Sequence, residues 1–182
     1  MAGTGLGMTT SWKFQHQRRN TMKHFGKLLI TAILFIFSAV LAVRADDVAD
    51  IKAFFDNYVN AANSYDSSLV DYYSPNAKII RYVIQEDGTI HPKPLVTGMD
   101  EYTKQLKLGS AGAKLRRYKN YYSNVNIAKQ GSGYKISASR RPSTSDYSLP
   151  AYFVVNKDSS GKYRIIEEMM QTKAQMLLRY ID

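Results

Sequence analysis

The sequence predicts an α+β fold in which helices come first and a mostly antiparallel sheet follows. Two observations lead to this prediction. Apolar side chains recur at helical spacing soon after residue 46, and strand-like segments separated by turn residues fill residues 118–173. Helices that precede such strands cover one face of the sheet. The 137 residues from 46 to 182 suit a single domain.

The first helix is expected over residues 48–62, where apolar side chains fall at Val48, Ile51, Phe54, Phe55, Tyr58 and Val59. Asp66 is a favourable N-cap for a short second helix. Ser74-Pro75-Asn76 should end that helix, because the residue before a proline avoids helical angles.

A third helix is expected to begin at Thr97, with Asp100 as its capping acid. The glycine-containing residues 107–114 are expected to form a loop after it. The tail, residues 174–182, carries Met176, Leu177, Tyr180 and Ile181 at the spacing of a short amphipathic helix.

Five strands are expected from β-branched and aromatic composition and from the turns between them. They cover residues 77–85, 118–129, 134–141, 148–156 and 163–173. Gln130-Gly131-Ser132-Gly133 is typical of a hairpin turn and joins the second strand to the third.

The first 45 residues have the pattern of a secretory signal peptide. Lys23 and Lys27 precede an apolar run over residues 28–43, and cleavage is expected after Ala45. The signal itself would then start at Met22. An uncleaved anchor is the alternative, although a run of 16 residues is short of the roughly 20 that span a bilayer. The pattern therefore predicts a periplasmic or secreted protein that meets the membrane only if the segment is kept.

Composition limits the partners and cofactors that can be expected. The chain has 25 Lys and Arg against 15 Asp and Glu, but six of the basic side chains lie in residues 1–45, where there is no acidic one. The remaining 19 basic and 15 acidic side chains give no strong reason to expect a nucleic-acid partner. The absence of cysteine excludes disulfides and thiolate metal sites. No metal or other cofactor is expected, since His91 is the only histidine after residue 45.

Several segments together resemble one known superfamily. They are Tyr58-Val59-Asn60-Ala61-Ala62-Asn63 with Asp66, then Leu69-Val70-Asp71-Tyr72-Tyr73-Ser74-Pro75-Asn76-Ala77, Gly98-Met99-Asp100-Glu101-Tyr102, and the closing hairpin at residues 158–166. This order is similar to the nuclear transport factor 2-like (NTF2-like) superfamily, and the chain resembles an exported bacterial member. The resemblance implies the cystatin-like cone fold of ketosteroid isomerase and polyketide-cyclase-like proteins, with a pocket between the sheet and the first helix. It also implies a homodimer.

The isomerase branch of that superfamily uses a tyrosine on the first helix, a carboxylate base on the first strand and a protonated carboxyl group on a later strand. Tyr58 matches the tyrosine. Arg81 falls at the position of the base, and residues 150–153 offer no acid at the third position. Arginine stays protonated and cannot act as a base. Isomerase chemistry is therefore not expected, and no catalytic residue is assigned.

Arg81 is nevertheless unusual, because Ile79, Ile80, Tyr82 and Val83 surround it. Strand alternation sends one of Glu167 and Glu168 into the cone. Alignment with the superfamily that the chain resembles favours Glu168. We therefore consider an Arg81–Glu168 pair that orients a polar ligand, and a purely structural salt bridge is the alternative.

Aromatic residues could complete a pocket around that pair. All 14 tyrosines lie after residue 45, and Tyr58, Tyr102 and Tyr152 are pocket candidates together with Arg81 and Glu168. Tyrosine offers an apolar ring with a polar tip, which suits an amphipathic or aromatic ligand, although it also suits ordinary strand packing.

A basic stretch follows the third helix and contains Lys114, Arg116, Arg117 and Lys119. This surface basic patch, like the dipeptide Arg140-Arg141, is expected to be solvated, with anionic lipid or cell-wall polymer as the alternative partner. The function expected first is non-catalytic binding of a small molecule or a protein partner. A cyclase- or dehydratase-like enzyme and an envelope assembly component stay open as alternatives.

Overall fold

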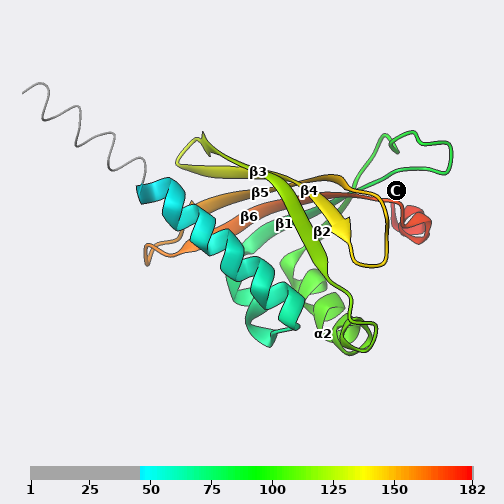
Figure 1. Ribbon diagram of the computed structural model, residues 1–182, viewed down its shortest axis with the longest axis horizontal. Helices are drawn as coiled ribbons and strands as arrows, with labels where there is room; N and C mark the ends of the chain where they lie inside the picture. Colours follow the sequence, from blue (N-terminus) through cyan, green and yellow to red (C-terminus); the bar gives the residue numbers. More distant parts are fainter. Residues whose placement is uncertain (1–45, 182) are drawn as a thin grey trace, which may run out of the picture. The chain divides into compact units, whose positions relative to one another are not determined.

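The structure is a computed structural model that describes residues 46–181, and Val48 begins one compact unit. Figure 1 shows this unit as a curved sheet with helices packed on one face. The α+β prediction is confirmed. The expected signal peptide lies outside the described residues. Within residues 46–181, no helix combines the length and apolar character needed to cross a membrane.

The first helix covers residues 46–64 and buries the apolar face that its spacing predicts. Ile51, Phe55 and Tyr58 are almost fully buried against the sheet. The ring centroids of Phe55 and Phe153 lie 5.1 Å apart, and those of Tyr58 and Phe153 lie 5.3 Å apart. The helix ends at Tyr65, whose left-handed backbone (φ 59°) breaks the helical path.

The 3-10 helix η1 (Ser67–Tyr72) follows, and the Asp66 carboxylate caps it by accepting from the Ser68 amide at 2.8 Å. The predicted N-cap is therefore confirmed. Strand β1 (Tyr73–Val83) starts earlier than predicted and includes Pro75. Its register against β6 shifts between Tyr73 and Lys78, so the irregular stretch accommodates a proline that cannot donate a ladder hydrogen bond.

Two predictions about the middle of the chain are wrong. Thr97 does not cap a helix but lies in strand β2 (Leu95–Gly98), and helix α2 (Met99–Leu115) begins with Gly98 as its N-cap without a side-chain cap. The expected loop at residues 107–114 is part of α2. Its glycines and Ser110 weaken helix propensity, at a cost of about 1 kcal/mol per glycine, yet α2 continues through this largely exposed stretch.

The rest of the sheet follows the prediction closely. Strands β3 (Asn120–Gln130), β4 (Gly133–Pro142), β5 (Leu149–Lys157) and β6 (Tyr163–Thr172) are antiparallel neighbours, and the 3-10 helix η2 (Gln175–Tyr180) forms the tail. The six strands lie in the order β2-β1-β6-β5-β4-β3. Only the central β1–β6 pair is parallel among the described strands, and it brings the early and late parts of the chain together.

Glycine substitutions at two positions test this packing. A methyl group at Gly133 would overlap the Val155 carbonyl oxygen and the Asn156 side chain, whereas one at Gly109 in α2 would meet nothing. We expect Gly133→Ala to lower the free energy of unfolding by about 2 kcal/mol. Gly109→Ala should raise it by about 0.5–1 kcal/mol. Urea denaturation of both variants measures this, and equal effects would contradict the close approach at Gly133.

Candidate functional site

A cavity of about 670 Å³ lies between the helices and the sheet. The first helix, η1 and α2 line it together with the ends of β1, β3, β4 and β6. About half of its lining residues are aromatic or aliphatic, and they include Tyr58, Tyr65, Leu69, Tyr102, Leu106, Tyr118, Met170 and Leu177. A cavity of this size is within the range of small-molecule sites.

A buried carboxylate lies behind one wall of this cavity. Glu168 on β6 has no exposed surface, and its Oε2 accepts hydrogen bonds from the hydroxyls of Tyr58, at 3.0 Å, and Tyr73. The two hydroxyls are also 3.0 Å apart. A helix residue and a β1 residue therefore hold the same carboxylate oxygen.

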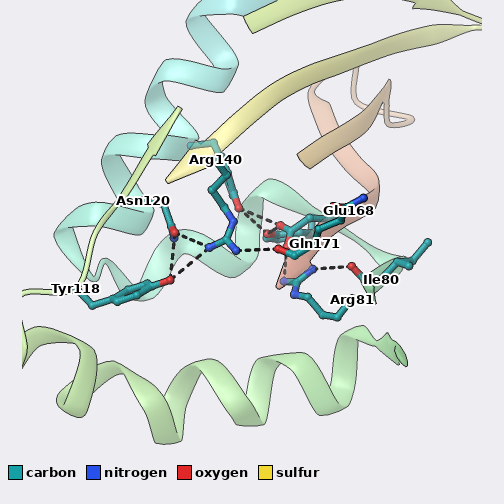
Figure 2. Close-up of polar contacts among 9 residues, drawn as sticks. Ile80, Arg81, Tyr118, Asn120, Arg140, Glu168 and Gln171 are labelled. Atoms are coloured by element: carbon teal, nitrogen blue, oxygen red, sulfur yellow. Dashed lines mark hydrogen bonds and ion pairs between the residues drawn. The ribbon is translucent and has the colours of Figure 1, made fainter. Parts of the chain in front are cut away.

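Arg81 compensates this carboxylate. Its Nη2 lies 2.5 Å from Oε1 of Glu168, and its Nη1 donates to the Ile80 carbonyl at 3.0 Å. Burial is the largest single influence and lowers the pKa of Arg81, but the charge of Glu168, its hydrogen bond with Arg81 and the nearby Tyr102 and Tyr73 together outweigh burial, so the net pKa is raised. Arg81 is therefore a permanent cation, and the pair crosses from β1 to β6 (Figure 2).

The tyrosines around Glu168 are hydroxyl donors rather than bases. Burial raises the pKa of Tyr58 and Tyr73 well above the ordinary value, and the charge of Glu168 adds to the effect. The same two causes raise the pKa of Tyr102 to about 12. These three groups stay protonated at neutral pH, so they can orient a ligand or a carboxylate by donating hydrogen bonds.

The structure brings most of the candidate pocket residues together. Tyr58, Arg81 and Tyr102 line the cavity, while Glu168 lies beneath them and is fully enclosed. Tyr152 is not brought to the cavity. It is flanked on β5 by the buried Ala151 and Phe153, so alternation turns it to the opposite face of the sheet. There its hydroxyl donates to Glu167 at 2.8 Å.

The four residues of the surface basic patch lie at the end of α2 and in the turn that follows. Lys114, Arg116, Arg117 and Lys119 are all exposed. Within residues 46–181, no group of three histidine or acidic side chains is arranged to hold a metal ion.

Arg140 is the main residue that the sequence reasoning misplaced. It is only 6% exposed and lines the cavity, whereas its neighbour Arg141 is exposed and stacks on Tyr121 at 4.9 Å. Strand parity is the signal that could have found it. Tyr134, Ile136 and Ala138 are buried on β4, and Arg140 is the next residue of that series.

Neutral groups hold the Arg140 guanidinium. Nη1 donates to Asn120 Oδ1 at 2.8 Å and to the Tyr118 hydroxyl at 3.4 Å, and Nη2 donates to the Gln171 carbonyl at 3.1 Å. Figure 2 shows Arg140 between Tyr118 and Asn120 on one side and Gln171 on the other. The Asn63 side chain pairs with both backbone groups of Asn120, at 3.0 and 2.9 Å, and so fixes this arrangement from the first helix.

The sequence matches no protein-family model and no curated protein. Solved structures match the fold. An NTF2-like protein of unknown function from Pseudomonas putida KT2440 is 12% identical with a TM-score of 0.55, and the match covers 70% of this chain and 87% of that chain. An NTF2-like protein with a cystatin-like fold from Novosphingobium aromaticivorans is 10% identical with a TM-score of 0.56, covering 75% and 88%.

A protein from Catenulispora acidiphila, solved in complex with S-DNPA, is 10% identical with a TM-score of 0.52, covering 74% of this chain and 98% of that chain. The chain therefore has the NTF2-like cone fold, and the fold that the resemblance implied is confirmed. At these identities the likeness shows the fold alone, so any statement of function depends on the site.

The buried ion pair can be tested through stability. Arg81→Met would leave Glu168 buried without its cation, and we expect the free energy of unfolding to fall by about 3 kcal/mol or more. The double variant Arg81→Met/Glu168→Gln should recover most of this loss, because a neutral amide can still accept from Tyr58 and Tyr73. Urea denaturation measures both. A double variant no more stable than the single one would contradict a compensated buried charge.

Alkaline pH gives a second test. The folded pKa of Tyr102 is about 12, and an unfolded tyrosine titrates near 10. Above pH 10 the unfolded chain has lost a proton that the folded chain keeps, so stability falls as pH rises from 10 towards 12. Tyr102→Phe should make this fall shallower in urea denaturation at several pH values. The control is Tyr180→Phe, at a ring 59% exposed, and identical slopes for the two variants would refute this account.

Proposed function

We propose that this chain binds a small amphipathic molecule in the cavity and does not convert it chemically. The observation that carries the proposal is a cavity of about 670 Å³ whose lining combines tyrosine and aliphatic side chains with polar ones, among them the fixed Arg140. Sites for small molecules combine these properties, with apolar walls supplying affinity and a few polar groups supplying orientation.

The environment of Glu168 favours binding over catalysis. A general base must reach the proton that it removes, but Glu168 is fully enclosed. Arg81 holds one of its oxygens, and two tyrosine hydroxyls hold the other. Glu168 is a carboxylate, as a general base often is, but all its contacts are inside the protein. Arg81 cannot act as the base in its place, because arginine stays protonated.

The complex of the Catenulispora acidiphila protein with S-DNPA supports the proposal by analogy, since it shows a protein of similar fold with a bound small molecule. Three further parts of the proposal rest on sequence reasoning. Export to the periplasm or the exterior follows from the pattern of residues 1–45, and removal of that segment follows from the same pattern. The homodimer follows from the resemblance and stays a prediction.

Filling the cavity tests the proposal. Leu106 lines the cavity, and Leu108 on the same helix is 85% exposed. We expect Leu106→Trp to weaken binding of the neutral fluorescent probe phenylnaphthylamine by about tenfold, because the indole would occupy the ligand space. Leu108→Trp adds the same side chain outside the cavity and should bind as the unmodified chain does.

Fluorescence titration of the three purified chains gives the comparison. Any probe that binds elsewhere, including to residues 1–45, contributes equally to all of them. Equal probe affinity in the Leu106→Trp and Leu108→Trp variants would overturn the proposed site.

A further inference from the structure

We propose that the molecule bound in this cavity carries an oxyanion group, a carboxylate or a sulfonate, and that this group pairs with Arg140. The inference rests on the proposed binding function and deepens it by naming the chemical class of the ligand. Four observations support it.

The first observation is an uncompensated buried charge. Arg140 is only 6% exposed, and an arginine guanidinium is always protonated. Within residues 46–181 its side chain forms no ion pair with a carboxylate, unlike Arg81 and Arg164. A buried charge is costly unless it is paired, so an anion at this place would supply what the protein does not.

The second observation is unused hydrogen-bonding capacity. A guanidinium has five N–H donors, and Arg140 meets three acceptors, all of them on neutral groups. Its Nε is buried without a hydrogen-bond partner. Buried polar groups in folded proteins are nearly always satisfied, so the unused donors point to a missing acceptor. Oxyanions match guanidinium geometry particularly well because they accept two parallel hydrogen bonds.

The third observation concerns the other charges of the cavity wall. Four cations line it, namely Arg81, Lys107, Arg140 and Lys173, and Asp66 is the one acidic residue among the lining residues. Glu168 already neutralises Arg81, and the two lysines are exposed. The wall therefore favours an anion, and the enclosed cation available to it is Arg140.

The fourth observation is that Arg140 is held in position. Asn63 on the first helix fixes Asn120, and Asn120 in turn accepts from Arg140. A side chain that is already ordered loses little conformational entropy when a ligand binds. Together with the apolar walls, this arrangement fits an amphipathic anion whose head contacts Arg140 and whose apolar part contacts the tyrosines and Leu106.

Two probes that differ in one group test the inference. Anilinonaphthalene sulfonate and phenylnaphthylamine share their aromatic skeleton, and only the first carries an anion. For each probe, the cavity signal is the part of the fluorescence that Leu106→Trp removes. We expect the anionic probe to bind the wild-type cavity at least about tenfold more tightly than the neutral one, as a charge-assisted hydrogen bond requires.

Arg140→Gln should remove this preference, because the anionic probe loses its charged partner and weakens more than the neutral probe does. The matched control Lys107→Gln removes an exposed cation of the same wall and should retain most of the preference. If Arg140→Gln does not fold, Arg140→Lys replaces it. That variant keeps the charge but loses the planar donor pair, and it should weaken the anionic probe selectively.

The outcomes separate the two proposals. If Leu106→Trp removes signal from neither probe, the proposed binding function is wrong. If it removes signal from both, but the wild-type cavity shows no preference for the anion, this inference alone is overturned. The same conclusion follows if the preference survives in the Arg140 variant and disappears in Lys107→Gln.

Discussion

The ion pair between Arg81 and Glu168 is the constraint on which the interior of this protein depends. It joins β1 to β6, the parallel pair at the centre of the sheet, and it lies beneath the first helix. A carboxylate with no exposed surface needs a cation and hydrogen-bond donors to be tolerated there. Arg81, Tyr58 and Tyr73 supply them, so the helix, the entry to β1 and the late strand β6 are tied to one group.

The enclosure of the Arg81–Glu168 pair limits the chemistry that the cavity can support. Because Glu168 is enclosed and Arg81 is neutralised, neither is available as a free charge in the ligand space. The enclosed polar groups that remain in the cavity wall include tyrosine hydroxyls and Arg140, a cation held by neutral acceptors. Arg81 falls at the position of the catalytic base in the isomerase branch, but here it pairs with Glu168 and stabilises the interior. Arg140 is the second enclosed arginine, and we propose it for ligand recognition. The fold is shared with proteins of many functions, so this division of roles carries the functional argument.

Periodicity predicted most of the fold, because the dominant signal in the sequence is burial of one face of each element. Ile51, Phe55 and Tyr58 identified the first helix, and alternation identified the long strands. Local signals failed at two places in the middle of the chain. Helix α2 continues through Gly109 and Gly112, and Thr97 belongs to a short edge strand rather than to a helix cap.

The candidate site was predicted in part for the same reason. Arg81 and Glu168 stood out as charged residues in apolar strands. Strand parity left Glu167 and Glu168 as alternatives, and the family resemblance favoured Glu168. Tyr152 was misplaced because its strand alternates in the opposite sense. Arg140 was taken for surface because it is followed by another arginine, although the parity of β4 turns it inwards. The network from Asn63 through Asn120 to Arg140 joins residues far apart in the chain, and composition or spacing could not reveal it.

The central claim is that the cavity holds a small molecule, and native mass spectrometry of the purified chain tests it most directly. The account predicts a bound mass that is retained under native conditions and released on denaturation. That mass should be present in the unmodified chain and in the exposed-site control Leu108→Trp, and depleted in Leu106→Trp, whose added indole fills the cavity. A bound mass that persists unchanged in the cavity-filling variant, or no bound mass in any of the three, would contradict the account.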